Sequence, residues 1–211
     1  MSLGVMPNES SLPPAVVGPA FLQDGTEVWV RPAQPADRDL VERFVGTVSL
    51  DALEERYFTA LRPSGVPKEG CAPSRPEDRL SLLVLGERGT SVSILGVGEY
   101  VRTADRSALA EVAFLVAEPF RGLGIASLLL ARLARAARTY GIVRFVARVR
   151  SENPEMLEVF RASGFPFTEQ RLQDEVDVVF PIVPTEGPES ARSAAPPDRH
   201  PRHRTARRAL A

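Results

Sequence analysis

Two glycines and an arginine lie in a short turn between an apolar strand and a long apolar helix. The turn contains Arg121, Gly122, Leu123 and Gly124, and the helix continues to Tyr140. Glycines let the backbone turn tightly and leave its N–H groups uncovered by side chains. These donors converge at a helix N-terminus, where the helix dipole favours an anion. The spacing therefore predicts a cradle for a phosphate or diphosphate, with an ordinary tight strand-to-helix turn as the alternative.

The same glycines are also close to a dinucleotide-binding fingerprint, with Ser127 at the third position. That fingerprint needs a strand–turn–helix–strand unit and an acidic residue about 20 residues further on, which binds the ribose. The next apolar run, residues 142–149, is followed by no acidic residue before Glu152. A run of consecutive predicted strands, moreover, precedes the turn. The order of elements therefore argues against a Rossmann-type domain.

Glu111 is a candidate general base in the strand that leads into the turn. It stands among Leu109, Ala110, Val112 and Ala113, on a strand that is apolar on both faces. Burial in such surroundings makes a carboxylate a better proton acceptor. The alternative is a structural carboxylate paired with an arginine at a strand end.

Glu99, on the neighbouring strand, is the second candidate base. A solvated charge of a hairpin is the alternative for that residue.

Histidine chemistry is excluded from the part of the chain that is predicted to fold. Both histidines, His200 and His203, lie in the C-terminal segment. A Ser-His-Asp hydrolase, a Cys-His protease and a His-bound zinc site all need an imidazole inside the domain. Cys71 is the only cysteine, and we expect it to be incidental in a protein of the reducing cytoplasm. The chemistry therefore falls to carboxylates, backbone amides and a bound cofactor, without a metal.

Length and composition predict a single domain with a sizeable core. Of 211 residues, 44% are hydrophobic, and the prolines gather before residue 21, between residues 62 and 78, and after residue 180. We expect a flexible tail over 1–20, a folded domain over 21–182 and a disordered Pro/Arg-rich tail over 183–211. The net charge of −1 and the absence of a long apolar run favour neither nucleic acid nor a membrane as a partner.

Hydrophobic periodicity predicts a meander of strands followed by one long helix. Strands are expected over 27–31, 80–86, 94–102, 108–117, 143–149, 165–172 and 176–180, with polar turn residues over 87–93. Helices are expected over 36–45, over 49–61 with Ser49 as its cap, from the glycine turn to Tyr140, and from Pro154 towards Gly164; residues 62–78 are expected to form a loop. This order does not fit the alternating pattern of a doubly wound fold.

The turn resembles a known cofactor loop. Residues 121–126, RGLGIA, are similar to the R/Q-x-x-G-x-G/A loop with which the GNAT superfamily of N-acetyltransferases holds the pyrophosphate of acetyl-CoA. The resemblance extends over residues 24–181. Residues 24–32, DGTEVWVRP, resemble the first strand of the bacterial protein lysine acetyltransferase (Pat-type) branch, and residues 110–116, AEVAFLV, resemble its central strand.

The resemblance implies an α/β fold of the GNAT type in a single domain. Its central sheet would be mixed, mostly antiparallel, of about seven strands flanked by about four helices, and splayed where acetyl-CoA binds.

The resemblance also assigns roles to residues. Glu111 matches the glutamate of the central strand that serves as the base. The residues implied to bind acetyl-CoA are Phe114, Leu115, Val116, Arg121, Gly122, Leu123, Gly124, Ile125, Ala126, Asn153 and Phe160. A backbone N–H of the central strand would polarise the thioester carbonyl. Asn153 would bond the pantetheine arm, and a plain helix cap is its alternative.

Phe160 departs from the family pattern. Many members carry a tyrosine there, which protonates the departing CoA thiolate. A phenylalanine has no proton to give, so either water serves or the thiolate leaves unassisted. Phe160 is then expected to pack against the pantetheine or to belong to the core.

We therefore predict an acetyl-CoA-dependent N-acetyltransferase that works by direct transfer in a ternary complex. The first substrate class is a lysine side chain of a protein, for instance an acyl-CoA synthetase. A small amine or amino acid is the alternative with the same chemistry. A non-catalytic acyl-CoA-binding module that regulates a partner is the alternative from another class.

Overall fold

The computed structural model describes residues 12–48, 75–88, 91–104 and 108–182. The strands are β1 (Gly18–Phe21), β2 (Glu27–Pro32), β3 (Arg79–Arg88), β4 (Ser91–Arg102), β5 (Leu109–Val116), β6 (Arg144–Arg150), β7 (Thr168–Leu172) and β8 (Glu175–Pro181). The helices are α1 (Arg38–Val45), α4 (Ile125–Thr139) and α5 (Pro154–Arg161), with short 3-10 helices η2 (Pro35–Asp37) and η3 (Glu118–Phe120). No helix in these ranges is long and apolar enough to cross a membrane.

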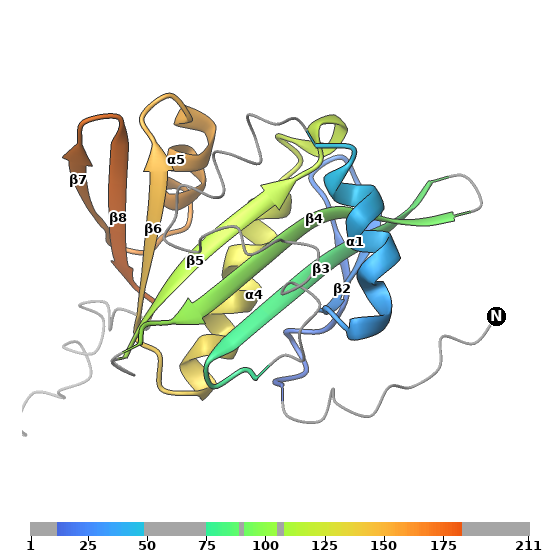
Figure 1. Ribbon diagram of the computed structural model, residues 1–211, viewed down its shortest axis with the longest axis horizontal. Helices are drawn as coiled ribbons and strands as arrows, with labels where there is room; N and C mark the ends of the chain where they lie inside the picture. The colour runs from blue at the N-terminus through green and yellow to red at the C-terminus, as the bar shows by residue number, and fades with distance from the viewer. Residues whose placement is uncertain (1–11, 49–74, 89–90, 105–107, 183–211) are drawn as a thin grey trace, which may run out of the picture.

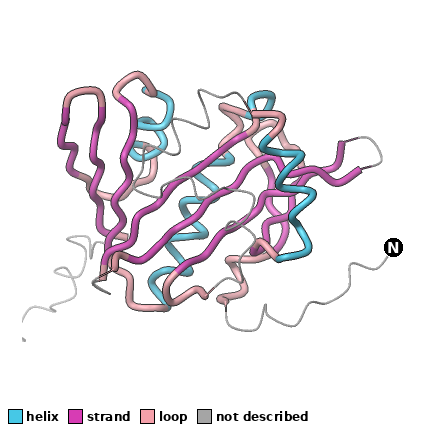
Figure 2. Tube along the Cα trace, in the orientation of Figure 1, coloured by secondary structure: helices cyan, strands magenta, loops and turns pink. Residues whose placement is uncertain are grey.

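All eight strands form one open sheet in the order β1-β2-β3-β4-β5-β6-β8-β7 (Figure 2). Neighbouring strands are antiparallel except β5 and β6, which are parallel. A parallel neighbour requires a crossover connection. Here α4 provides it, and Figure 1 shows α4 and α1 on opposite faces of the sheet.

The parallel ladder between β5 and β6 is short. It ends where Glu111 lies opposite Val146. Beyond this pair β5 continues its ladder with β4 as far as Val116, and β6 continues its ladder with β8 as far as Arg150. The two strands therefore separate after Glu111 and Val146, and we call this point the fork.

The core is divided between the two faces of the sheet. The larger cluster packs α4 and α5 on one face, and it includes Ala110, Val112 and Phe114 of β5. The smaller cluster packs α1 on the other face, and it includes Leu115. Because successive side chains of a strand point to opposite faces, Glu111 lies on the same face as Leu115.

The fold class predicted from the sequence is confirmed, with one strand more than expected. The additional strand is β1, which pairs with β2 from Gly18 opposite Val30 to Phe21 opposite Glu27. The prediction of a flexible tail is therefore wrong for residues 12–20. Val16 is fully buried there, because the segment packs on the core beside α4.

Some boundaries also differ from those expected. β4 begins at Ser91, inside the stretch predicted as a turn, because the hairpin of β3 and β4 continues beyond its apolar part. The strand expected over 165–172 begins only at Thr168. The predicted helix over 49–61, most of the loop over 62–78 with Cys71, residues 1–11, and residues 183–211 with both histidines lie outside the described residues.

Candidate active site

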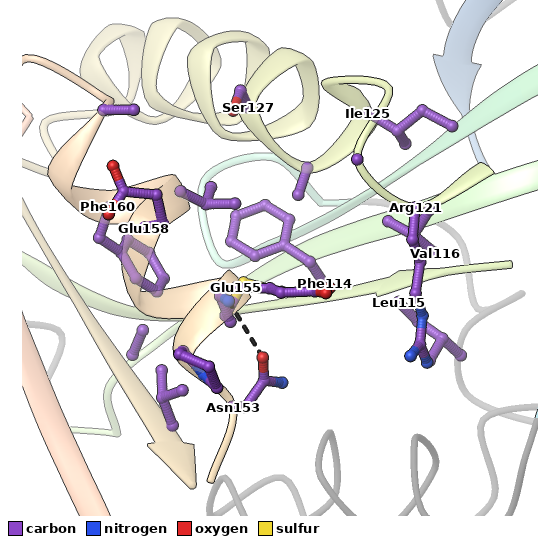
Figure 3. A pocket seen from close by; sticks show the side chains of 18 of the residues that line it. Phe114, Leu115, Val116, Arg121, Ile125, Ser127, Asn153, Glu155, Glu158 and Phe160 are labelled. Carbon is purple, nitrogen blue, oxygen red and sulfur yellow. Dashed lines mark hydrogen bonds between the residues drawn. The ribbon is translucent and has the colours of Figure 1, made fainter. Parts of the chain in front are cut away.

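A cavity of about 700 Å³ opens at the fork between β5 and β6. Its walls come from the end of β5, the glycine turn, the first turn of α4, the outer half of β6 and α5 (Figure 3). Ten of the residues predicted to bind acetyl-CoA line it: Phe114, Leu115, Val116, Arg121, Gly122, Gly124, Ile125, Ala126, Asn153 and Phe160. The fold thus brings together residues that are up to 46 positions apart in the sequence (160 − 114).

The glycine turn has the backbone conformation that its sequence predicts. Gly122 and Gly124 have φ angles of 73° and 85°, in the left-handed region that favours glycine. Gly124 is the N-cap of α4, without a side-chain cap and without an acidic residue in the first turn. The first N–H groups of a helix have no acceptor within it. Those of α4 therefore remain available for an anion beside the cavity.

The space in front of the turn is open. A Cβ added at Gly122 would meet no heavy atom within 4 Å. Arg121 is exposed and contributes a positive charge to the same wall. An open backbone cradle, a helix N-terminus and a guanidinium fit the diphosphate of a coenzyme.

Leu123 is the one predicted cofactor residue that does not line the cavity. Its side chain packs against the larger core cluster, and its carbonyl oxygen accepts a hydrogen bond from the backbone N–H of Gln23 at 3.2 Å. Leu123 therefore anchors the turn from behind.

Aromatic rings form the inner wall of the cavity. The rings of Phe114 and Phe160 lie with their centroids 6.2 Å apart, and Phe160 is also 5.3 Å from Phe180. Phe160 is buried, so the core role expected for it is present, and the residue also lines the cavity.

Asn153 caps α5 at the cavity wall. Its Oδ1 accepts a hydrogen bond from the backbone N–H of Met156 at 3.0 Å, which Figure 3 shows as a dashed line. Pro154 occupies the first helical position, where the missing N–H costs nothing. The cap role, given as the alternative for Asn153, is therefore present in the structure.

Glu111 stands at the fork but not in the lining of the cavity. It is half-buried, opposite Val101 of β4 on one side and Val146 of β6 on the other. Its position on the face away from α4 separates it from the glycine turn, which lies on the α4 side.

Arg148 is a charged side chain on the same face of the sheet as Glu111. Arg148 of β6 donates a hydrogen bond from Nε to Asp177 Oδ1 at 2.9 Å, and Glu175 Oε2 lies 3.4 Å from the same nitrogen. The bond to Asp177 raises the pKa of the Arg148 guanidinium, and the Glu111 carboxylate adds a smaller Coulombic contribution in the same direction.

Sequence reasoning missed Arg148, although it lines the cavity. The available signal was the alternation of β6, in which Arg144, Arg148 and Arg150 share one face and apolar residues take the other.

Glu99, the second candidate base, is buried and already paired. It forms an ion pair with Arg79 and accepts a hydrogen bond from Ser81 Oγ at 2.9 Å. Glu99 is therefore not a solvated charge of a hairpin, which was the alternative expected from the sequence.

The fold and the cavity agree with what comparison with known proteins finds. The model of the acetyltransferase (GNAT) family matches residues 47–165, and the chain belongs to this family. It is similar to the acetyltransferase Pat of Mycolicibacterium smegmatis, with 27% identity over 163 residues, which are 76% of this chain and 48% of the relative. The chain thus spans about half the length of that curated relative.

Two solved structures extend the comparison. The GNAT domain of S. lividans PAT has a TM-score of 0.68 and 29% identity, over 80% of this chain and 98% of that domain. Mycobacterium smegmatis RimJ in complex with CoA-disulfide shares the fold, with a TM-score of 0.54 and 20% identity over 82% of this chain and 88% of RimJ.

These findings confirm the GNAT family and the likeness to its Pat-like branch. Within the described residues, no group of three or more metal-ligating side chains is placed to hold a metal ion.

Proposed function

We propose that this protein transfers the acetyl group of acetyl-CoA to the side-chain amine of a lysine in a protein, with Glu111 as the general base. The observation that carries the proposal is the position of Glu111 at the fork, beside a cavity that the open glycine turn bounds. Similarity to two Pat proteins supports a protein as acceptor. An acyl-CoA synthetase of the cytoplasm is the first acceptor to test.

The residues that would hold acetyl-CoA form two groups, one for the diphosphate and one for the pantetheine arm. Arg121, Gly122 and Gly124, with the first N–H groups of α4, would bind the diphosphate. Phe114, Leu115 and Val116 would line the pantetheine arm together with Asn153. When bound, acetyl-CoA supplies an acetyl group that is activated as a thioester.

Glu111 would accept the proton that the acceptor amine must lose before it can attack. A lysine amine has a pKa near 10.4, and supplying its neutral form at pH 7 costs about 4–5 kcal/mol. A carboxylate within reach, directly or through one water, takes up that proton. Because Glu111 lies on the face away from α4, the amine would approach from that face while the donor occupies the α4 side. The two reactants would then meet at the fork, which supports direct transfer.

The variant Glu111→Gln tests the proposal with little change of shape. We expect kcat to fall by about 10²- to 10⁴-fold, which is the usual contribution of a general base. The dissociation constant for acetyl-CoA, measured by calorimetry, should stay unchanged. Glu27→Gln, at an exposed position of β2, is the control and should keep its full turnover.

Two results would count against the proposal. Full turnover in Glu111→Gln would remove Glu111 as the base. A parent protein that binds acetyl-CoA but acetylates nothing would favour the acyl-CoA-binding module.

The acceptor is found by incubating the protein with labelled acetyl-CoA and a lysate. Label on lysine residues of a protein supports the proposed substrate class, and mass spectrometry then identifies the site. Label on small molecules instead would favour the small-amine alternative. The Glu111→Gln variant in a parallel reaction shows which label depends on the enzyme.

A further inference from the structure

The segment 12–23, which we call the N-terminal arm, is attached to the helix that bears the cofactor turn. Arg132 of α4 donates from Nη1 to the carbonyl oxygens of Val16 and Gly18, both at 3.1 Å, and from Nη2 to that of Pro19 at 2.9 Å. Val16 and Leu22 are buried in the larger core cluster. The arm therefore has a fixed position along α4.

The arm ends beside the glycine turn. The backbone N–H of Gln23 donates to the carbonyl oxygen of Leu123, within that turn. The Gln23 side chain lies against Gly124: a Cβ built on Gly124 would be 3.2 Å from Gln23 Nε2. Gln23 also lines the cavity.

A tight turn after Gln23 keeps it in place. The backbone N–H of Leu22 donates to the carbonyl of Thr26 at 2.9 Å, and that of Gly25 donates to Leu22 at 3.0 Å. Asp24 Oδ1 accepts a bond from the backbone N–H of Thr26 at 2.9 Å, which lowers the pKa of Asp24. The residues before and after Gln23 in the chain therefore fix its position.

We propose that Gln23 is a cofactor-binding residue, whose side-chain amide forms the outer wall of the glycine turn and donates a hydrogen bond to the diphosphate of acetyl-CoA. The inference rests on the proposed function, because it takes the turn as the diphosphate site. Gly122 and Gly124 bring backbone donors but no side chain. The carboxamide of Gln23 supplies two further N–H donors at the same place without a charge.

The attachment of the N-terminal arm to α4 supports this role. Arg132 and the Leu123 carbonyl tie the arm to both ends of the segment that runs from the turn into the helix. The position of the Gln23 amide relative to the helix N-terminus is therefore fixed before the cofactor arrives, which reduces the entropy lost on binding.

The test is the variant Gln23→Glu in the full chain, which keeps the shape and replaces the donor by a negative charge. We expect the dissociation constant for acetyl-CoA to rise by about tenfold or more, which corresponds to one lost hydrogen bond to a charged group. Turnover with acetyl-pantetheine, which has the thioester but no diphosphate, should stay at the parent value. Gln173→Glu, the same change in the exposed turn between β7 and β8, is the control.

Two further variants make the outcome decisive. Gln23→Met removes the donor without adding a charge, so it gives an answer even where the glutamate disturbs folding, and it should weaken acetyl-CoA binding with acetyl-pantetheine turnover retained. Arg121→Ala tests the turn itself. Normal acetyl-CoA binding in both Gln23 variants, with weaker binding in Arg121→Ala, would overturn the role of Gln23 and leave the proposed site intact.

Other results are equally informative. Unchanged affinity in all three variants would remove the turn as the diphosphate site and the role of Gln23 with it. Equal losses with acetyl-CoA and acetyl-pantetheine would make Gln23 a structural residue and overturn the inference.

Discussion

Glu111 of β5 and Val146 of β6 form the last pair of their parallel ladder, and the two strands separate beyond them. The carboxylate proposed as the base therefore stands where the sheet opens. Residues before this pair are fixed by strands on both sides, so the backbone of Glu111 is held in place. Such rigidity suits a group that must meet an acceptor amine in one geometry.

The first prediction concerns Arg148, which faces Glu111 from β6. Replacing it in Arg148→Met removes a positive charge that favours the ionised carboxylate. Asp177 is the main cause that raises the pKa of the Arg148 guanidinium, and Glu111 contributes to a smaller extent. The Coulombic attraction between Arg148 and Glu111 favours the charged form of both groups. Without Arg148, Glu111 should hold its proton to higher pH. We therefore expect the acid limb of the kcat/KM profile to move to higher pH, by less than about one unit because the site is partly solvated.

Two variants serve as controls for this pH profile. Arg161→Met removes an exposed charge of α5 that pairs with Glu169, and it should leave the acid limb in place. Arg148→Lys keeps the charge and should restore most of the parent profile. An acid limb that stays fixed in Arg148→Met would show that Glu111 is not the group that titrates in it.

Much of the sheet could be predicted because its central strands carry their own signal. β4 and β5 are long and apolar, and α4 has a continuous apolar side. β1 carries no such signal, since its four residues, GPAF, include a glycine and a proline and show no alternation. It is held by Arg132, more than 110 positions further along the chain. A contact of that kind cannot be read from local periodicity.

The residues of the candidate site also differ in how far the sequence predicts them. The turn and the end of β5 are contiguous in the sequence, so one motif identifies most of the cavity wall. Gln23 follows β1 in the chain and belongs to no local pattern. Arg148 belongs to the alternation of β6, but that alternation does not show that it lines the cavity. Leu123 was assigned to the cofactor with the rest of its motif, but its side chain packs on the core, and sequence spacing does not distinguish these two directions.

The second prediction concerns the open space at Gly122. In Gly122→Ala the residue must keep a φ of 73°, which costs an ordinary residue about 1–2 kcal/mol. The free energy of unfolding should fall by that amount. The methyl group would also enter the space in front of the backbone donors, so the dissociation constant for acetyl-CoA should rise.

Gly141→Ala is the matched control for this change. Gly141 has a φ of 74° and, like Gly122, nothing within 4 Å of an added Cβ, but it follows the far end of α4. It should lose the same stability in thermal unfolding and keep its affinity for acetyl-CoA. Equal affinities in the two variants would mean that the turn does not hold the diphosphate.

The third prediction separates the two roles of Asn153. Asn153→Ala loses the bond to the Met156 N–H, and it should cost about 1 kcal/mol of stability, as is typical for an N-cap. Asn153→Ser keeps an oxygen that can cap α5 but loses the carboxamide. We expect the serine to restore the melting temperature and to leave the KM for acetyl-CoA raised. A serine variant that restores both quantities would reduce Asn153 to a helix cap.

The last prediction asks whether an acid at position 160 would assist the leaving group. Phe160→Tyr adds a hydroxyl to a ring that already touches the cavity, while its packing on Phe114 and Phe180 is kept. We expect kcat to rise, because the phenol can protonate the departing thiolate. A new alkaline limb should also be seen in the pH profile, near the phenol pKa of about 10, because the deprotonated phenol has no proton to give.

Phe165→Tyr is the control, since that ring stacks on Phe180 without lining the cavity. It should leave both kcat and the alkaline limb unchanged. If Phe160→Tyr folds with the parent melting temperature and gives neither effect, protonation of the thiolate does not limit turnover. In that case the phenylalanine costs the reaction nothing, because either water protonates the thiolate or the thiolate leaves unassisted.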